Sequence, residues 1–262
     1  MSSLPRSTKR LLADFKNYIK NKPELTYISV CNNDIHNVKV LILGAKDTPY
    51  QYGNFFIDLK FTNDYPFNPP KGVFKTTNGS IRMNPNLYQD GKICLSILGT
   101  WSGPSWSIVQ NLTSVVISIQ SLLTEFPLRN EPGYEKCQED EPKLINYNKY
   151  VEFHTINYSI VKMIQNKLYP PEFEYYIIKN FFDNYEAIYN IVDQNLKFDG
   201  EIASTTYLQL KVRLEYQKLQ LELIELYKYA DNYLKENKDT DFSQKIYTYK
   251  DNKGNEKSYK IL

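Results

Sequence analysis

Apolar residues are spaced for a helix at the start of the chain and for strands directly after it. Over residues 7–20 they recur every three or four positions, as at Leu11 and Phe15, and Ser7 or Thr8 is available as an N-cap. Four short runs rich in apolar residues follow, separated by turn residues, at 25–30, 38–43, 54–61 and 72–77. One helix followed by a run of strands predicts an α+β fold with a four-stranded antiparallel meander.

The helical spacing returns in the second half of the chain. It predicts helices over 107–125, 143–168, 172–193 and 205–234. Pro170 and Pro171 end the second of these helices, because proline lacks the amide donor that a helix requires. The remaining residues are mostly polar and predict a loose tail.

Charge and cysteine content indicate which partners and which kinds of site this chain is not expected to have. The 32 basic and 30 acidic residues leave a formal net charge of +2, which gives no electrostatic reason to expect nucleic acid or a membrane as partner. The sequence shows neither a signal-peptide pattern nor an apolar run long enough to span a bilayer. Its three cysteines are widely spaced without a C-x-x-C pair, so neither a disulfide framework nor a metal site is expected. We therefore expect a protein of a reducing compartment, the cytoplasm or the nucleus.

Cys94 lies in the stretch NPNLYQDGKICLSIL (84–98), and its neighbours allow two interpretations. Ile93 and Leu95 are apolar, which favours a small buried side chain that fills a core. The preceding segment is rich in loop-forming residues, with Asn86 eight positions before the cysteine and a Gly-Lys turn just ahead of it. Loops carry functional side chains more often than they fill cores, which favours a nucleophile.

A nucleophilic cysteine needs partners, and the sequence offers two kinds. A cysteine hydrolase requires a histidine base, but no recognisable catalytic signature surrounds His36 or His154. Exchange between thioesters requires no histidine, and transfer of the acyl group to an amine then needs an oxyanion donor and a carboxylate that orients the amine. Asn86 and Glu131 match these two needs. The pattern therefore favours thioester chemistry over hydrolysis.

Several stretches around Cys94 together resemble the ubiquitin-conjugating enzyme family. They are DTPYQYGNFFIDLKFTNDYPFNPPKGVFKT (47–76), the loop MNPNLY with GKICLSIL after it, and the tryptophan-bearing loop GTWSGPSW. Their order and spacing match the family over roughly residues 6–165, and SIQSLLTE and NEPGYE are similar to its large Z-type branch. The resemblance implies the family's α+β fold, with a catalytic core over 1–165, a helical extension over 166–234 and the polar tail over 235–262.

The resemblance also assigns roles to the residues that match the family's motifs. Cys94 takes the place of the cysteine that carries ubiquitin, or a related modifier, as a thioester. Asn86 matches the asparagine that stabilises the oxyanion or holds the nearby loop, and Asn84 stands where most members have a histidine with a structural role. The residue that gates the acceptor lysine is Glu131 or its neighbour Asn130.

Two binding surfaces are implied in the same way. The basic face of the first helix would meet the activating enzyme, through Arg6, Lys9, Arg10 and Lys16. A solvated face without a partner is the alternative for these residues. Phe67 and Ser107 match the two loops that contact ubiquitin ligases, and an insertion between Gly99 and Ser105 is expected on the rim of the site.

The expected partners are ubiquitin or a ubiquitin-like modifier, an activating enzyme, a ligase and protein substrates. No cofactor is expected on this chain, because in the family's pathway the activating enzyme consumes the ATP. The alternative is an inactive module that presents ubiquitin or a ligase without chemistry. Retention of both Cys94 and Asn86 argues against that alternative.

Overall fold

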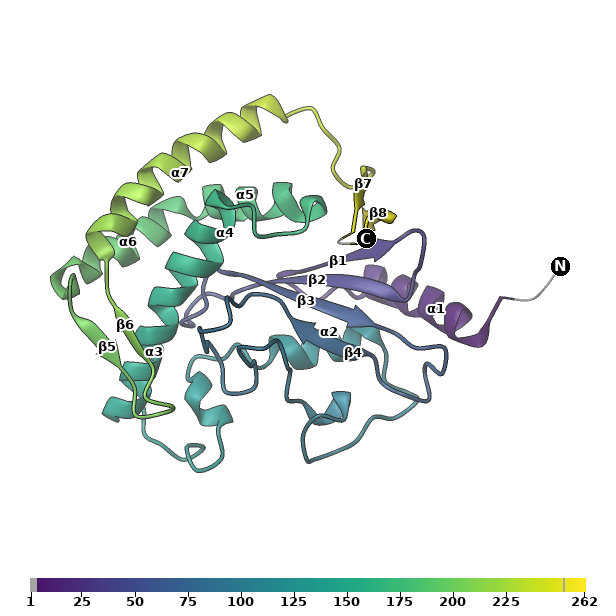
Figure 1. The fold of residues 1–262 in the computed structure, drawn as a ribbon, viewed down its shortest axis with the longest axis horizontal. Coiled ribbons are helices and arrows are strands. Elements are labelled where there is room, and N and C mark those ends of the chain that lie inside the picture. The colour runs from purple at the N-terminus through teal and green to yellow at the C-terminus, as the bar shows by residue number, and fades with distance from the viewer. Residues whose placement is uncertain (1–3, 252) are drawn as a thin grey trace.

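The structure is a computed structural model that describes residues 4–251 and 253–262. Figure 1 shows a central antiparallel sheet with helices on both faces. The first four strands are neighbours in chain order, as the sequence predicts; they are β1 (Thr26–Cys31), β2 (Asn37–Leu43), β3 (Asn54–Lys60) and β4 (Lys71–Phe74). The α+β prediction is therefore confirmed.

The N-terminal helix α1 (Arg6–Lys20) begins one residue earlier than the spacing predicts, and its cap is not the expected one. Pro5 occupies the N-cap position without a side-chain hydrogen bond. Ser7 lies inside the helix, is buried, and its hydroxyl lies 3.2 Å from Nε2 of His36. The expectation of a Ser7 or Thr8 cap is wrong because the tertiary contact of Ser7 draws it into the first turn.

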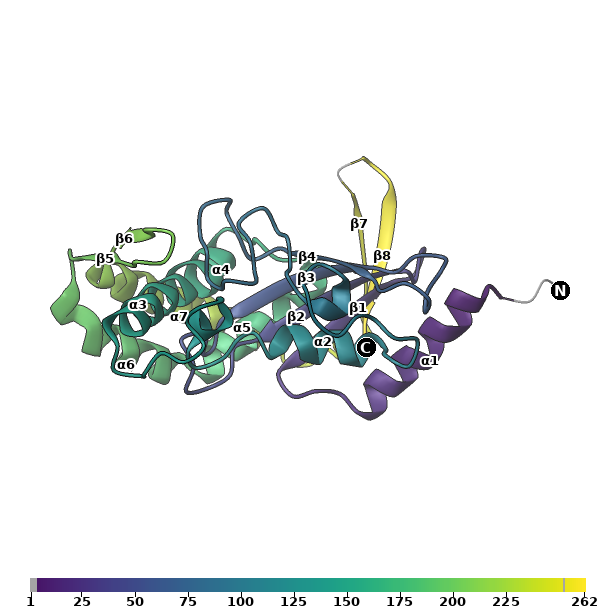
Figure 2. The same cartoon turned by 90° about the horizontal axis from the view of Figure 1, so that it is seen from below.

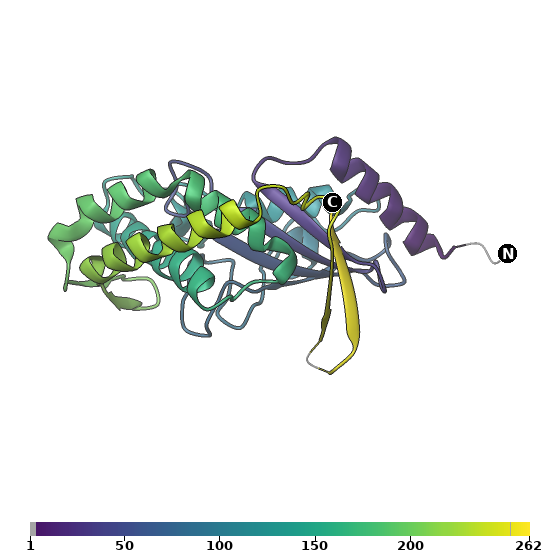
Figure 3. The same cartoon turned by 90° about the horizontal axis from the view of Figure 1, so that it is seen from above.

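The tail contains a β-hairpin, so the prediction of a loose segment over 235–262 is wrong. Strand β8 (Glu256–Ile261) pairs antiparallel with β1, and β7 (Ile246–Lys250) pairs with β8. The sheet thus has six strands in the order β4-β3-β2-β1-β8-β7. Figures 2 and 3 show this hairpin projecting from the sheet. Along β8, Tyr259 and Ile261 are buried while Lys260 between them is only half-buried, an alternation that composition alone does not reveal.

A buried ion pair holds the hairpin to the sheet. The Glu172 carboxylate is fully buried and lies 3.2 Å from Nζ of Lys39 on β2. The Tyr249 hydroxyl of β7 contacts both groups, and the Lys39 ammonium also lies 3.7 Å from the centre of the Tyr259 ring. Burying a charge is tolerated when it is paired and hydrogen-bonded, as it is here.

Alternating side chains of the central strands feed two separate hydrophobic cores. On β2, Val40 and Ile42 belong to the core shared with α1 and α2 (Leu112–Gln120), whereas Leu41 and Leu43 belong to the core on the opposite face. Both faces of the central strands are therefore covered. This explains the continuous apolar run VKVLIL, which a sheet with one solvated face would not require.

Helix α2 is shorter than the predicted helix over 107–125. Asn111 caps it by accepting from the Ser114 amide at 3.0 Å, while the Ser114 hydroxyl bonds back to the Asn111 amide at 3.4 Å. This reciprocal capping box fixes the start of the helix, and residues before it form an exposed loop.

The helices of the extension pack on the second face of the sheet (Figures 1 and 3). The segment predicted over 143–168 is helical up to Gln165, as α3 (Pro142–His154), a π-helical stretch (Thr155–Lys162) and α4 (Met163–Gln165). The helix predicted over 172–193 is two helices, α5 (Glu174–Asp183) and α6 (Tyr185–Asn195), interrupted at Asn184. Within the described residues, no helix is both long and apolar enough to cross a membrane.

The helix predicted over 205–234 begins later than expected, as α7 (Tyr216–Glu236). The residues before it form a two-stranded hairpin of β5 (Ile202–Ser204) and β6 (Lys211–Arg213). Ala203, Thr205 and Tyr207 are buried while the residues between them are exposed, the period of two that identifies a strand. This hairpin lies against α3 rather than in the main sheet (Figure 1).

Candidate active site

Asn86 and Cys94 face each other across a small hairpin. The Cys94 amide donates to the Asn86 carbonyl at 2.8 Å, and Nδ2 of Asn86 donates to the Cys94 carbonyl at 2.8 Å. Next to this pair, Leu87 and Ile93 form an antiparallel β-bridge. The turn closes through the Gly91 amide, which donates to the Tyr88 carbonyl at 3.0 Å. The eight-residue spacing therefore makes the two residues a cross-strand pair.

Gly91 makes this turn possible for two reasons. Its φ is +91°, in the left-handed region that side chains disfavour. A Cβ at this position would also lie 2.9 Å from the carbonyl oxygen of Phe74, because the Gly91 carbonyl accepts from the Phe74 amide at 2.8 Å. The turn is thereby fixed to the end of β4.

Asn84 stands where most family members have a histidine, and it is hydrogen-bonded throughout. It is fully buried, and its Nδ2 donates to the Tyr50 hydroxyl at 2.9 Å and to the Leu122 carbonyl at 2.8 Å. Its Oδ1 accepts from the Asn86 amide at 2.8 Å. The side-chain amide of Asn84 thus bonds to both the Tyr50 hydroxyl and the Leu122 carbonyl, and it holds the Asn86 backbone in place.

The thiol of Cys94 is largely enclosed. The residue is 2% exposed, yet it belongs to neither of the two hydrophobic cores. The hydroxyl of Thr100 bonds to both flanking residues: it donates to the Ile93 carbonyl at 2.6 Å and accepts from the Leu95 amide at 3.0 Å. The exposed segment 99–105, where the insertion was expected, is therefore attached directly, through Thr100, to the residues on either side of the cysteine.

Glu131 and Asn130, the two candidates for the gate, make different contacts. Nδ2 of Asn130 donates to the Leu122 carbonyl at 3.1 Å, the same oxygen that Asn84 uses. Glu131 is half-buried, and its Oε2 accepts a hydrogen bond of 3.1 Å from the Tyr207 hydroxyl of the β5–β6 hairpin. Asn130 thus links its own loop, which also carries Glu131, to the hydrogen bonds that Asn84 makes. Glu131 instead presents a carboxylate beside the extension.

Neither histidine is arranged as a base for Cys94. The His36 ring lies within 3.2 Å of both the Asp34 carboxylate and the Ser7 hydroxyl, so both ring nitrogens have partners. His154 is buried in α3 with its ring 4.5 Å from that of Tyr150, and burial lowers its pKa to about 4. These contacts argue against a cysteine–histidine hydrolase.

The structure brings the first helix next to both predicted ligase loops. The Arg10 guanidinium donates to the carbonyls of Ile108 and Gln110 at 2.8 and 2.6 Å. The Arg6 guanidinium lies 4.7 Å from the centre of the Phe67 ring. Arg10 therefore has an internal role beside the one predicted for it.

The other residues predicted for these surfaces face solvent. Lys9 and Lys16 are exposed on α1. Phe67 is 55% exposed, and Ser107 is exposed beside Ile108 and Val109. Apolar groups held at the surface next to basic ones are typical of protein interfaces, so the predicted use of this region for partners stands as a prediction.

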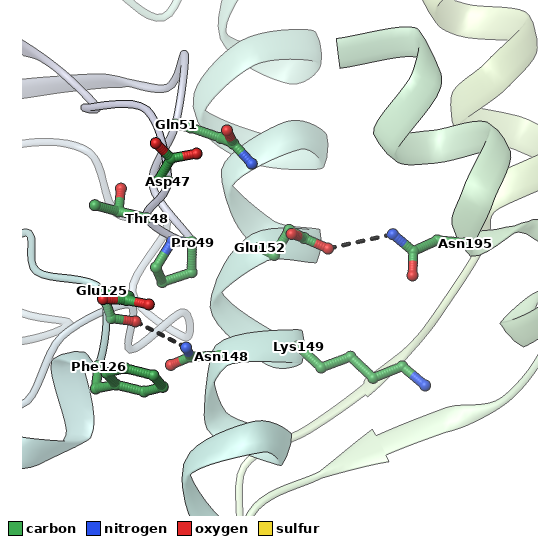
Figure 4. A pocket seen from close by; sticks show the side chains of 10 residues that line it. All are labelled: Asp47, Thr48, Pro49, Gln51, Glu125, Phe126, Asn148, Lys149, Glu152 and Asn195. Atoms are coloured by element: carbon green, nitrogen blue, oxygen red, sulfur yellow. Dashed lines mark hydrogen bonds between the residues drawn. The ribbon is translucent and has the colours of Figure 1, made fainter. Parts of the chain in front are cut away.

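Two cavities lie away from Cys94. One, of about 430 Å³, is bordered by the loop 47–51, residues of α3 and Asn195 (Figure 4). In it the Asn195 amide lies 3.3 Å from the Glu152 carboxylate, and burial raises the pKa of Glu152. The other, of about 910 Å³, lies between the sheet and the β7–β8 hairpin. Across the described ranges, no group of three or more His, Cys, Asp or Glu side chains is arranged to hold a metal ion.

Sequence reasoning missed Tyr207, because it follows Glu131 by 76 positions in a segment predicted to be helical. Only the alternation of residues 203–207 could have indicated a strand there. The sequence also did not indicate which groups Asn84 binds, because the Tyr50 hydroxyl and the Leu122 carbonyl come from distant segments.

Comparison with known proteins gives concordant matches. The family model described as "Ubiquitin-conjugating enzyme" matches residues 10–167. Ubiquitin-conjugating enzyme E2 Z of Danio rerio is 36% identical over 217 residues, covering 82% of this chain and 66% of the relative. The human E2 Z is 36% identical over 222 residues (84% and 62%), and that of Xenopus tropicalis is 35% identical over 212 residues (80% and 67%). The chain thus spans about two thirds or less of the length of these relatives.

Proposed function

The chain belongs to the ubiquitin-conjugating enzyme family, and from this premise we propose that it carries ubiquitin, or a related modifier, as a thioester on Cys94 and transfers it to lysine. The observation that carries the proposal is the pairing of Cys94 with Asn86 across the hairpin. It joins a nucleophile to an amide donor in a rigid frame outside both hydrophobic cores.

In the first step Cys94 takes the modifier from the activating enzyme. Its thiolate attacks the thioester carbonyl carbon, a new carbon–sulfur bond forms, and the activating enzyme's cysteine leaves as a thiolate. One thioester replaces another, so the step needs no strong base and no energy source on this chain. We accordingly propose that the chain itself requires neither metal nor nucleotide, and that ATP is consumed earlier, by the activating enzyme.

In the second step the lysine amine attacks the thioester carbonyl and the Cys94 thiolate leaves. The carbonyl oxygen carries negative charge in between, and an amide N–H stabilises it best when it is already held in place. Nδ2 of Asn86 has two hydrogens, of which one is bound to the Cys94 carbonyl. The other is suited to the oxyanion, and Glu131 is suited to orient the lysine and accept its proton.

The partners follow from the surfaces. We assign Arg6, Lys9 and Lys16 to contact with the activating enzyme and Phe67 and Ser107 to contact with a ligase, because exposed basic and apolar groups gather there. A free thiol must stay reduced to form a thioester, which favours the cytoplasm or the nucleus.

The test of the main proposal is a charging assay. The full chain is incubated with an activating enzyme, ATP and ubiquitin, and the products are run on a non-reducing gel. We expect a band heavier by one ubiquitin that disappears with reductant and is absent from Cys94→Ala. Failure to charge with several activating enzymes and several modifiers would overturn the proposal.

The gate is tested in the same assay by adding free lysine to the charged protein. Glu131→Ala should slow discharge onto lysine more than it slows charging. If Asn130→Ala has that effect and Glu131→Ala does not, the gate is Asn130. The contacts favour Glu131, because the Asn130 amide is engaged by the Leu122 carbonyl.

One observation favours a second candidate function, an inactive module that presents ubiquitin or a ligase. Cys94 is only 2% exposed, so its thiol must become accessible before it can react. The charging gel separates the two functions. An inactive module would bind an activating enzyme, ubiquitin or a ligase without forming the reductant-sensitive band.

A further inference from the structure

The β5–β6 hairpin carries one residue of the extension into the core that underlies the candidate active site. Among the described residues, Tyr207 is the one buried member of that core that follows residue 151. Its ring packs edge-on against Tyr147 of α3, with centroids 5.7 Å apart, and against Tyr134 at 6.3 Å. The extension therefore continues the packing of the catalytic core at this point.

The backbone around Tyr207 is held in an unfavourable conformation. Leu208 and Gln209, at the tip of the hairpin, have φ of 51° and 50°, and neither is a glycine. Left-handed conformations disfavour such residues and persist where the surrounding structure enforces them. Here the Thr205 hydroxyl donates to the Tyr207 carbonyl at 2.5 Å, and the Thr205 amide donates to the Leu210 carbonyl at 2.9 Å. Strain of this kind at a loop tip is often associated with a functional side chain.

The base of the hairpin is fixed to the core as well. The Gly200 amide donates to the Leu214 carbonyl at 2.7 Å, and the Leu214 amide donates to the backbone carbonyl of Glu201 at 2.8 Å. The Glu201 carboxylate lies 3.4 Å from Nζ of Lys149 on α3. The position of Tyr207 is thus determined at both ends of the hairpin.

The hydroxyl of Tyr207 points to the gate. It donates to Oε2 of Glu131 at 3.1 Å, and Tyr207 is 8% exposed, so water competes little for this contact. Burial and the Glu131 carboxylate raise the pKa of Tyr207 to about 12, which keeps the phenol protonated and a donor at neutral pH. A glutamate has three side-chain torsions, and this bond restricts them.

We propose that Tyr207 is a positioning residue for lysine transfer, which acts by holding the Glu131 carboxylate in the orientation that receives the acceptor amine. The inference rests on the proposed function, and it gives the extension a part in the reaction. The extension supplies a donor to the Glu131 carboxylate that the described part of the core, residues 4–165, does not provide. The hairpin 202–213 thereby completes the acceptor side of the site.

The chemistry of the acceptor predicts whether its reaction slows when the Tyr207 hydroxyl is removed. Free lysine is protonated near neutral pH, so a carboxylate must orient its amine and take its proton as the carbon–nitrogen bond forms and the carbon–sulfur bond breaks. Hydroxylamine is unprotonated under these conditions and needs no such help. A positioning role therefore affects discharge onto lysine and leaves discharge onto hydroxylamine unchanged.

The experiment uses three variants of the full chain: Tyr207→Phe, Glu131→Ala and the double variant that carries both substitutions. Tyr207→Phe removes one hydroxyl and keeps the ring packing. The matched control is Tyr134→Phe, whose ring lies in the same aromatic group and whose hydroxyl has no hydrogen-bond partner within the described residues. Each protein is charged with ubiquitin, the activating enzyme is stopped, and lysine or hydroxylamine is added. Thermal unfolding of each variant checks that it is folded.

We expect Tyr207→Phe to charge like the wild type and to discharge onto lysine roughly tenfold more slowly, with hydroxylamine discharge unchanged. Tyr134→Phe should match the wild type. In the Glu131→Ala background, Tyr207→Phe should have no further effect, because its action passes through that carboxylate.

Two results would overturn the inference while leaving the proposed function intact. One is a charged Tyr207→Phe protein that discharges onto lysine at the wild-type rate. The other is a loss that is equal for both acceptors or that adds to the effect of Glu131→Ala, since either indicates general packing. A wild-type protein that never charges overturns the proposed function and this inference with it, and it is recognised before any acceptor is added.

Discussion

Asn84 and Asn130 donate to the same acceptor, the carbonyl oxygen of Leu122, at 2.8 and 3.1 Å. Asn84 also accepts from the amide of Asn86, whose side chain donates to the Cys94 carbonyl at 2.8 Å. A continuous hydrogen-bonded chain thus connects the loop that carries Asn130 and Glu131 to the cysteine through Leu122, which follows the C-terminus of α2. Buried networks of this kind fix a geometry because each unmet bond is costly.

The first prediction concerns the two asparagines of this network. Asn84→Ala should lower the free energy of unfolding by about 2–3 kcal/mol, because it leaves the buried Asn86 amide without an acceptor. Asn130→Ala should cost about 1 kcal/mol, because Leu122 keeps its bond from Asn84. Urea unfolding followed by circular dichroism measures both. If both variants lost the same free energy of unfolding, the bond to the shared Leu122 carbonyl, and not the bond from the Asn86 amide, would account for the effect of Asn84→Ala.

The second prediction concerns Asn86. Asn86→Ala should still charge but should discharge onto lysine about 100-fold more slowly, the usual cost of losing one oxyanion donor. Asn86→Asp tests the donor itself, because a carboxylate of the same shape cannot donate to the Cys94 carbonyl or to an oxyanion. Single-turnover discharge on a non-reducing gel gives the rates. Unchanged discharge in both variants would remove Asn86 from the oxyanion role.

The third prediction concerns access to Cys94. Thr100→Val removes the hydroxyl that bonds on both sides of the cysteine, so the enclosing segment should open more often. We expect Cys94 to react with a maleimide roughly three- to tenfold faster, as the loss of about one hydrogen bond implies. Ser102→Ala, an exposed substitution in the same segment, is the control. Peptide mass mapping distinguishes Cys94 from Cys31 and Cys137, which are buried as well. Equal rates of Cys94 modification in the wild type and both variants would contradict the prediction.

The fourth prediction is a pH dependence that comes from His154. Burial lowers the pKa of His154 to about 4 from its ordinary 6.5, so between these values the unfolded chain binds a proton that the folded chain does not. Stability is therefore lost as the pH falls through this window, by about 2 kcal/mol at pH 5. His154→Phe, in surroundings that already contain Tyr150 and Phe153, should make the decline between pH 7 and pH 5 shallower by that amount. Parallel stability curves for the two proteins would sink the idea.

The fifth prediction concerns the extension as a structural element. A chain that ends at residue 167 would expose Leu41, Leu43 and Phe56, which the extension helices now cover. We expect it to aggregate on expression, because a large exposed apolar face favours association. A chain that ends at residue 243 lacks only the β7–β8 hairpin and serves as the comparison, with a smaller expected loss of soluble yield. A soluble monomer ending at 167 that charges normally would show that the extension serves recruitment alone.

Helical and strand spacing indicated most of the core elements correctly, but it failed at three places in the extension and tail. Asn184 interrupts a helix whose apolar face continues on both sides of it. Residues 205–213 were predicted as the start of a helix, yet they belong to the hairpin in which β5 pairs with β6. The tail is polar in composition, although Tyr259 and Ile261 are buried beside β1. In each case long-range packing overrides local preference.

The sequence by itself identified the residues of the candidate site and the family to which the chain belongs. The spacing of Asn86 and Cys94 and the glycine turn between them are local features, but the neighbours of Cys94 alone favoured a core residue. The resemblance of the surrounding stretches to a family was needed to identify the motif. Tertiary structure decided what surrounds that motif. The enclosure of Cys94, the shared Leu122 carbonyl and the bond from Tyr207 to Glu131 join residues that are far apart in the chain. Their energies depend on how two cores pack against one sheet, and no local pattern encodes that packing.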